Sequence, residues 1–154
     1  LGYIGQSSKV LDAIPEGLDL KLGLTTPEMA KDFVSRTGVD LFAPAVGNIH
    51  GMMRVGHDPR LEIDLIQKIR EACGIPLVLH GGSGTVDEDF VHAISAGISI
   101  IHISTELRVA FRKSLALALQ ENPEEVAPYK YAKDAVQAVT KVTSERLKLF
   151  NNIK

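Results

Sequence analysis

The stretch LVLHGGSG, residues 77–84, joins a short run of branched apolar residues to a histidine and a glycine-rich turn. The apolar run is typical of a buried strand, and the three glycines after His80 favour a tight turn into a helix. Such a turn can aim backbone N–H groups at an anion, with the Ser83 hydroxyl and the next helix N-terminus adding to the attraction. The alternative is a turn that needs glycine only for its backbone angles. The stretch therefore predicts a strand, a turn and a candidate phosphate site.

The rest of the chain alternates helical patterns with short apolar runs, after a loop at 2–24. Thr25 and Glu28 have capping-box spacing for a first helix, and Asp58 and Pro59 are expected to open a second. Alternating strands and helices imply parallel strands joined by crossover helices. A closed eight-stranded barrel takes about 250 residues, so this chain is expected to form half of one. The expected helices are 25–38, 58–74, 87–97, 105–121 and 131–149, and the expected strands are 1–4, 39–47, 75–80 and 98–104.

Composition restricts the class of protein and its partners. The chain has 154 residues, 45% of them hydrophobic, and a formal net charge of −2 without a cluster of basic residues. We therefore expect no nucleic-acid partner and no anionic membrane partner. No apolar run reaches the roughly 18 residues of a membrane helix, and the single Cys73 fits a reducing compartment. The expectation is a cytoplasmic protein, and the start at Leu1 within a strand-like run suggests a fragment.

Polar residues and glycines follow each of the three clear strands, in GNIHG (47–51), HGGSG (80–84) and HISTE (102–106). In parallel α/β folds, ligands bind at this carboxyl edge of the sheet. His50 and His80 occupy corresponding positions thirty residues apart, and two neutral imidazoles suit Zn²⁺. Catalytic zinc normally has three protein ligands, so a third must come from elsewhere. For a histidine taken alone, a core or turn residue that donates a hydrogen bond is favoured over a metal ligand, and it is the pairing at equivalent positions that favours a metal site.

The segments VDLFAPAVGNIHG, IPLVLHGGSG and ISTELRVAF, in this order and spacing, resemble the C-terminal half of class II, zinc-dependent ketose-bisphosphate aldolases of the fructose/tagatose-bisphosphate type. The resemblance runs from about residue 25 to about residue 115. It implies an α/β fold that is the C-terminal half of a TIM (β/α)₈ barrel with extra C-terminal helices. Residues 1–154 would be a single partial domain of the last three to four βα units, without the N-terminal half.

The implied activity is the reversible aldol cleavage of a ketose 1,6-bisphosphate, of fructose or tagatose, to dihydroxyacetone phosphate and glyceraldehyde 3-phosphate. The resemblance implies a Zn²⁺ cofactor, with a monovalent cation as a second candidate, and a homo-oligomer, dimer or tetramer, when full length. His50 and His80 match two zinc ligands of the family. The implied phosphate-binding residues are Gly51, Arg54, Gly81, Ser83, His102 and Thr105.

The sequence departs from the family in three respects. The first zinc histidine and the catalytic aspartate of the family belong to the absent half, so this chain alone is expected to be inactive. The proton-transferring base is not identified, because the loop that carries acidic residues in relatives reads Gln6, Ser7 and Ser8 here, with Glu16 as a nearby carboxylate. His102 replaces a substrate-binding asparagine, and Arg54 replaces a common lysine.

Two other functions remain open at this point. Ser83 could be a hydrolase nucleophile, although the elbow pattern G-x-S-x-G requires a glycine where Thr85 stands. The alternative without catalysis is a sugar-phosphate-binding half-barrel that pairs with another chain to close its sheet.

Overall fold

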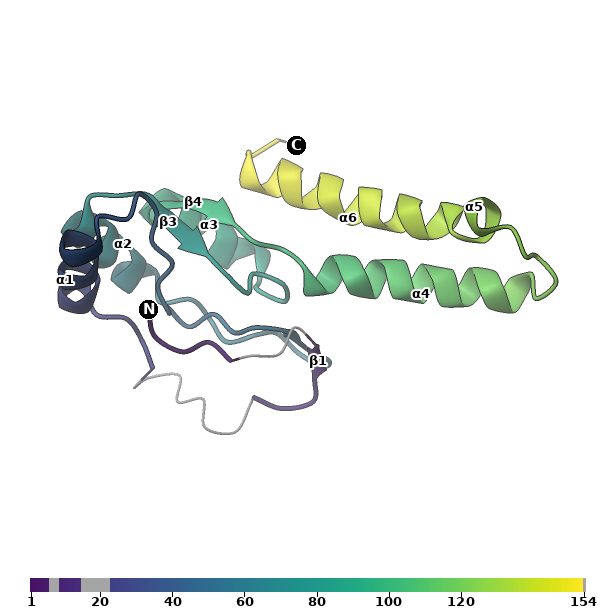
Figure 1. The fold of residues 1–154 in the computed structure, drawn as a ribbon, viewed down its shortest axis with the longest axis horizontal. Coiled ribbons are helices and arrows are strands. Elements are labelled where there is room, and N and C mark those ends of the chain that lie inside the picture. The colour runs from purple at the N-terminus through teal and green to yellow at the C-terminus, as the bar shows by residue number, and fades with distance from the viewer. Residues whose placement is uncertain (6–8, 15–22, 154) are drawn as a thin grey trace. The chain divides into compact units, whose positions relative to one another are not determined.

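The computed structural model describes residues 1–5, 9–14 and 23–153 (Figure 1). These residues form two compact units, 1–103 and 104–154. The expected base region, with Gln6, Ser7, Ser8 and Glu16, lies outside the described residues. Within the described part of the chain, none of the helices has the length and apolar character needed to cross a membrane.

The first unit is an α/β arrangement with four short strands paired two by two. Strand β1 runs parallel to β2, and β3 runs parallel to β4. The parallel pairing of β3 and β4 around an intervening helix is the βαβ pattern that the sequence predicts. The described strands do not by themselves make a half-barrel. The elements in order are β1 (Val10–Leu11), α1 (Pro27–Thr37), β2 (Met52–Met53), α2 (Ile63–Cys73), β3 (Leu77–Leu79), α3 (Asp87–Ala96) and β4 (Ile98–Ile101).

The expected strand at 39–47 is wrong, because this segment pairs with β3 at one residue only. Phe42 forms an isolated parallel bridge with Leu77. Its N–H donates to the carbonyl oxygen of Pro76 (3.2 Å), and its own carbonyl oxygen accepts from the N–H of Val78 (2.8 Å). Pro44 then has no N–H with which to continue a ladder. The segment therefore leaves the edge of β3 soon after Phe42.

The N-terminal residues, expected as a strand at 1–4, are also not a strand, but they lie along the same segment. The N–H of Ala45 donates to the carbonyl oxygen of Leu1 (3.1 Å), and the N–H of His50 donates to that of Ile4 (2.7 Å). These two bonds are spaced along the loop that leads to His50. The N-terminal segment therefore holds that loop in place.

Helix α1 begins one residue later than the capping-box spacing predicts. Thr26 is the N-cap, and its hydroxyl accepts from the N–H of Met29 (3.2 Å). Thr25 is buried instead. Its hydroxyl donates to the carbonyl oxygen of Leu1 (2.7 Å) and accepts from the N–H of Ala45 (2.9 Å). Thr25 therefore joins the N-terminal segment to the loop after Phe42 rather than capping the helix.

Helix α2 begins at Ile63, so Asp58 does not open it as expected. Its C-cap, Gly74, adopts a left-handed conformation and confirms the predicted end, and Gly97 ends α3 as predicted. Asp89, buried on α3, accepts from the N–H of Leu61 (2.9 Å) and thereby fixes the chain before α2. The largest fully buried apolar side chains of this unit belong to Val46, Ile49, Ile66, Ile69, Leu77, Leu79 and Phe90.

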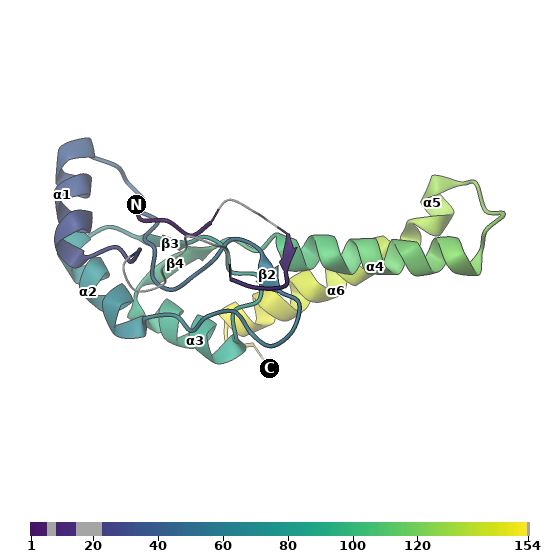
Figure 2. The same ribbon diagram turned by 90° about the horizontal axis from the view of Figure 1, so that it is seen from below.

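The second unit is helical. It contains α4 (Thr105–Glu121), the short α5 (Pro128–Tyr131) and α6 (Lys133–Phe150). Helices α4 and α6 pack side by side in both views (Figures 1 and 2). A bidentate ion pair joins them, since Arg146 Nε and Nη2 lie 2.8 and 2.9 Å from the two carboxylate oxygens of Glu106. The predicted helix at 105–121 is confirmed, and the region predicted as 131–149 contains α6, with α5 before it.

Candidate functional site

The loop before His50 and the end of β3 are held together by one buried side chain. Asn48 is 4% exposed. Its Oδ1 accepts from the N–H of Val46, and its Nδ2 donates to the carbonyl oxygen of His80, each at 2.8 Å. The backbone of His50 is held from the other side by its bond to Ile4. These contacts place the two predicted metal ligands on neighbouring, well-tethered segments.

Three imidazoles lie close together at this edge of the fold. The ring centroids of His50 and His80 are 6.1 Å apart, with the planes inclined at 69°. Those of His80 and His102 are 4.4 Å apart at 87°, and their Nδ1 atoms are separated by 3.2 Å. The sequence predicts the pairing of His50 with His80, and the structure brings these two rings together. It adds a direct contact of His102 with His80.

His50 and His80 also line one cavity of about 210 Å³. Burial lowers the pKa of His80, and the neighbouring His102 and His50 imidazoles lower it further. The lowered pKa favours the neutral form of His80, which is the form that binds a metal ion. The other residues lining the cavity are Leu1, Gly2, Ile4, Ala43, Pro44 and Ala45.

The described residues fit part of a metal site. Two imidazoles that line one cavity are a suitable donor set for zinc. Over residues 1–5, 9–14 and 23–153, however, no group of three or more His, Cys, Asp or Glu side chains could hold a metal ion. A complete site would therefore need a ligand from beyond these residues.

The glycine-rich turn after His80 needs glycine for packing. Gly81 has φ +63°, and a Cβ atom there would lie 2.7 Å from the carbonyl carbon of Ile49. Gly84 has φ +92°, and a Cβ there would lie 2.6 Å from the carboxylate of Asp58. These contacts account for both glycines without a ligand, as in the alternative of a plain turn. They leave the phosphate prediction untested.

The remaining predicted phosphate residues belong to separate segments of the chain. Ser83 is buried (2% exposed). Gly51 is buried directly after His50. Arg54 is exposed, and its Nε donates to the carboxylate of Asp12, which raises the pKa of the guanidinium. Thr105 begins α4 in the second unit, so its part in a site with the histidines stays a prediction.

Asn48 and Asp58 are structural contributors that the sequence prediction missed. The Oδ1 of Asp58 accepts from the N–H of Met53 (2.8 Å), while Oδ2 is buried without a hydrogen-bond partner in the described residues. Burial raises the pKa of Asp58, against the opposing effects of the Met53 bond and of His57. The amide of Asn48 in the GNIHG motif, directly after an apolar run, was a usable signal. The sequence offered no such signal for Asp58, because an Asp-Pro pair is typical of a helix start.

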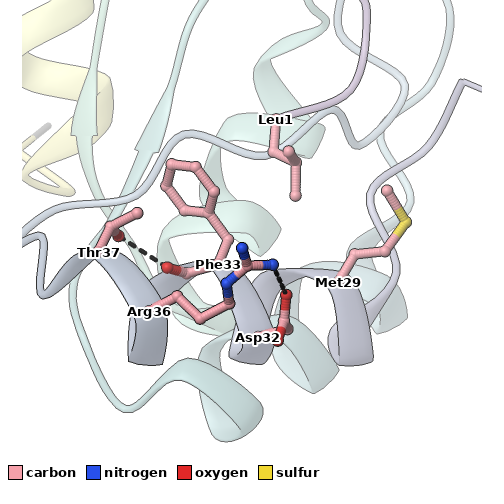
Figure 3. Close-up of a pocket in the computed structure, with 6 residues that line it drawn as sticks. All are labelled: Leu1, Met29, Asp32, Phe33, Arg36 and Thr37. Carbon is pink, nitrogen blue, oxygen red and sulfur yellow. Dashed lines mark hydrogen bonds and ion pairs between the residues drawn. The ribbon is translucent and has the colours of Figure 1, made fainter.

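A larger cavity, of about 470 Å³, is lined by residues of α1 and by Leu1 (Figure 3). Its polar side chains bond to one another or to their own helix. Arg36 pairs with Asp32 (3.3 Å), and the Thr37 hydroxyl donates to the carbonyl oxygen of Phe33 (2.7 Å). These are ordinary contacts between helix neighbours. The histidine cavity is therefore the better candidate for chemistry.

Comparison with known proteins gives a consistent result. The family model of class-II fructose-bisphosphate aldolase matches residues 1–154. The chain is 39% identical over 127 residues to D-tagatose-1,6-bisphosphate aldolase subunit GatY of Klebsiella oxytoca, a match that covers 82% of this chain and 44% of the relative.

Solved structures agree with this match. The YdjI aldolase of Escherichia coli K12 aligns with a TM-score of 0.65 and 36% identity, over 82% of this chain and 44% of its own. A structure from Coccidioides immitis, provisionally identified as a fructose-1,6-bisphosphate aldolase, aligns with a TM-score of 0.75 and 26% identity, over 97% of this chain and 50% of its own. The chain thus spans about half the length of the relatives it matches.

Proposed function

Because this chain belongs to the class-II fructose-bisphosphate aldolase family, we propose that it is the metal- and phosphate-binding half of an aldolase that cleaves a ketose 1,6-bisphosphate. The products would be dihydroxyacetone phosphate and glyceraldehyde 3-phosphate. The observation that carries the proposal is the placement of His50 and His80 around one cavity at the end of β3. The proposed fold of the whole is a TIM barrel, of which this chain is the C-terminal half.

In this proposal, His50 and His80 hold a zinc ion, and a third ligand comes from the other half of the barrel. When bound, such an ion acts as a Lewis acid on the ketone oxygen of the sugar. This chain itself contributes the placement of the two histidines. Asn48 fixes the carbonyl group of His80, and Ile4 fixes the backbone of His50, so that both backbones are in place before a ligand arrives.

We further propose that the substrate phosphate lies near the turn after His80. Gly81 and Ser83 belong to a turn that is followed by α3, and a helix N-terminus attracts anions. His102, next to His80, is within reach of the same region. Gly51, Arg54 and Thr105 complete the proposed set, with Arg54 having to leave Asp12 to bind a phosphate.

The chain alone is proposed to be inactive, because the catalytic aspartate and the first zinc histidine of the family belong to the upstream half. A homo-oligomer of the complete protein and a monovalent cation near the phosphate are further parts of this proposal. Cleavage itself would depend on a base from outside the described residues.

The test is zinc content and aldol cleavage of fructose and tagatose 1,6-bisphosphate. Both are measured on this chain alone and on the chain extended by a family upstream half. The proposal predicts one bound zinc ion and cleavage only in the extended protein, with the preferred sugar identifying the substrate. Binding of sugar phosphate without zinc and without cleavage would instead support the non-catalytic half-barrel. The described residues are compatible with that alternative, because they contain no group of three potential metal ligands.

A further inference from the structure

Asp58 joins the segment after His50 to the glycine-rich turn, residues 81–84. Its N–H donates to the carbonyl oxygen of Gly84 (3.3 Å), and its Oδ1 accepts from the N–H of Met53 (2.8 Å). Met53 belongs to β2, and Gly84 is the last residue of the turn. One residue therefore contacts both of the segments that follow the two histidines in the chain.

The carboxyl group of Asp58 lies against the backbone of Gly84. A Cβ atom on Gly84 would be 2.6 Å from Cγ, Oδ1 and Oδ2 alike. Because a carbon–carbon single bond is about 1.5 Å long, all three atoms lie within about 4 Å of the Cα atom of Gly84. Asp58 is only 6% exposed. Water therefore screens little of the effect that a charge on this carboxyl group has on the turn.

One oxygen of this carboxyl group is without a partner. Oδ2 is buried and accepts no hydrogen bond from the described residues, whereas Oδ1 accepts from the N–H of Met53. A buried charge without full pairing is costly. Burial accordingly raises the pKa of Asp58, against the lowering effects of the Met53 bond and of His57. Asp58 therefore holds its proton over a wider pH range than an exposed aspartate does.

The cationic side chains of the neighbouring segments do not neutralise Asp58. The glycine-rich turn itself carries no charged side chain. Within residues 1–5, 9–14 and 23–153, Asp58 forms no ion pair, so an ionised Asp58 would act on the turn at close to its full charge. The other charged or titratable groups of these segments and of the start of α3 are His57, Arg54 with its partner Asp12, Arg60 with its partners Glu88 and Asp89, and Asp87.

We propose that protonation of Asp58 controls how tightly the glycine-rich turn holds an anion, and that a phosphate monoester binds there with uptake of one proton by an ionised Asp58. The proton comes from solvent and joins the carboxylate, so that the anion does not face a second negative charge. The presence of a phosphate at the turn rests on the proposed function, whereas the contact of Asp58 with Gly84 does not.

The expected size of this coupling follows from Coulomb's law. Two unit charges about 8 Å apart, at an effective dielectric constant of about 20, repel strongly enough to weaken binding roughly 30-fold. Solvent and salt near the bound anion reduce this effect. We therefore expect ionisation of Asp58 to weaken the binding of a divalent anion roughly 5- to 30-fold.

The first measurement uses the unaltered chain and sulfate. Sulfate keeps two charges from about pH 4 to about pH 8, whereas a phosphate monoester titrates near pH 6. NMR of the chain with ¹³C-labelled aspartate carboxyl groups follows the titration of Asp58, and the amide signals of residues 81–84 report sulfate at the turn. Because coupling between two ligands is reciprocal, sulfate at constant ionic strength should move the titration of Asp58 to higher pH.

The second measurement compares sulfate affinity in two variants that each lose one negative charge. At about pH 8, Asp58→Asn should bind sulfate roughly 5- to 30-fold more tightly than wild type, and at about pH 4 the two should bind equally. Asp40→Asn is the matched control, because Asp40 is exposed and precedes Phe42, which bridges to Leu77 at the other end of β3. It should bind sulfate like wild type at both pH values.

The possible results separate this inference from the proposed function. If sulfate shifts the amide signals of the turn while the Asp58 titration stays in place, the coupling is wrong and the phosphate site stands. An affinity ratio between Asp58→Asn and wild type that is the same at both pH values would also overturn the coupling. If sulfate does not reach the turn, the coupling and the proposed phosphate site are both wrong, whereas zinc content and aldol cleavage test the rest of the proposed function.

Discussion

Gly81 and Ile49 belong to two loops whose backbones touch: a Cβ atom on Gly81 would lie 2.7 Å from the carbonyl carbon of Ile49. Ile49 directly precedes His50, and Gly81 directly follows His80. The absence of a side chain at 81 therefore sets how closely the two histidine-bearing segments approach. This close contact connects the glycine-rich turn to the geometry of the imidazole pair.

Gly81→Ala should destabilise the first unit by about 2 to 5 kcal/mol, because it combines a left-handed backbone penalty with forced overpacking. Gly74→Ala is the matched control, since Gly74 also has positive φ (+69°) but a Cβ there would meet nothing within 4 Å. The control should lose only about 1 to 2 kcal/mol. Urea unfolding measures both, and equal losses would show that the Ile49 contact is unimportant.

Asn48→Ala should cost about 1 to 3 kcal/mol of unfolding free energy, because it leaves the N–H of Val46 and the carbonyl group of His80 without their buried partner. Asn151→Ala serves as the comparison, since Asn151 bonds the Leu147 carbonyl group from an exposed position. That variant should change stability by less than about 0.5 kcal/mol. A loss at Asn48 no larger than the loss at Asn151 would contradict the role assigned to Asn48.

Asp58 should make the protein less stable as pH rises. Its folded pKa is raised above the ordinary value of 3.8, chiefly by burial. The folded state then holds the proton more tightly than the unfolded chain, so the penalty is absent below 3.8 and fully present above the raised folded pKa. Asp58→Asn keeps an oxygen for the Met53 N–H and carries no charge.

The measurement for Asp58 is the unfolding free energy of both proteins from about pH 3.5 to about pH 8. The variant should gain stability over the wild type as pH rises through that window. The other titratable groups are the same in both proteins, so their effects cancel in the difference between the two unfolding free energies. A difference that is independent of pH would show that the buried carboxyl group is not the cause. The opposite trend would show that its folded pKa is lowered.

The sequence predicts those parts of the fold that depend on local patterns. Apolar periodicity and terminal glycines locate α2 and α3 at their C-terminal ends, and α4 at both ends. The pairing of His50 with His80 also follows from their equivalent positions in successive units of the sequence, although the strand expected before His50 does not form. Local sequence signals are sufficient to predict the position of an element or residue when that position depends on one element or on a repeated unit.

The errors occur where contacts between distant segments outweigh local preference. Thr25 matches a capping box but is drawn into hydrogen bonds with Leu1 and Ala45, so Thr26 becomes the cap. The apolar run around Phe42 fits a strand, yet it bonds to β3 only at Phe42. Asp58 matches a helix start but packs against Gly84. A sequence pattern carries no information about such long-range partners.

The central claim is that His80 and His50 together bind the metal ion of an aldolase. The most direct test is zinc stoichiometry in the extended protein for His80→Ala, with His92→Ala, an exposed helical histidine, as the control. We predict that His80→Ala loses bound zinc and aldol cleavage together, while His92→Ala keeps one zinc ion and wild-type activity. Full zinc occupancy in folded His80→Ala would contradict the account.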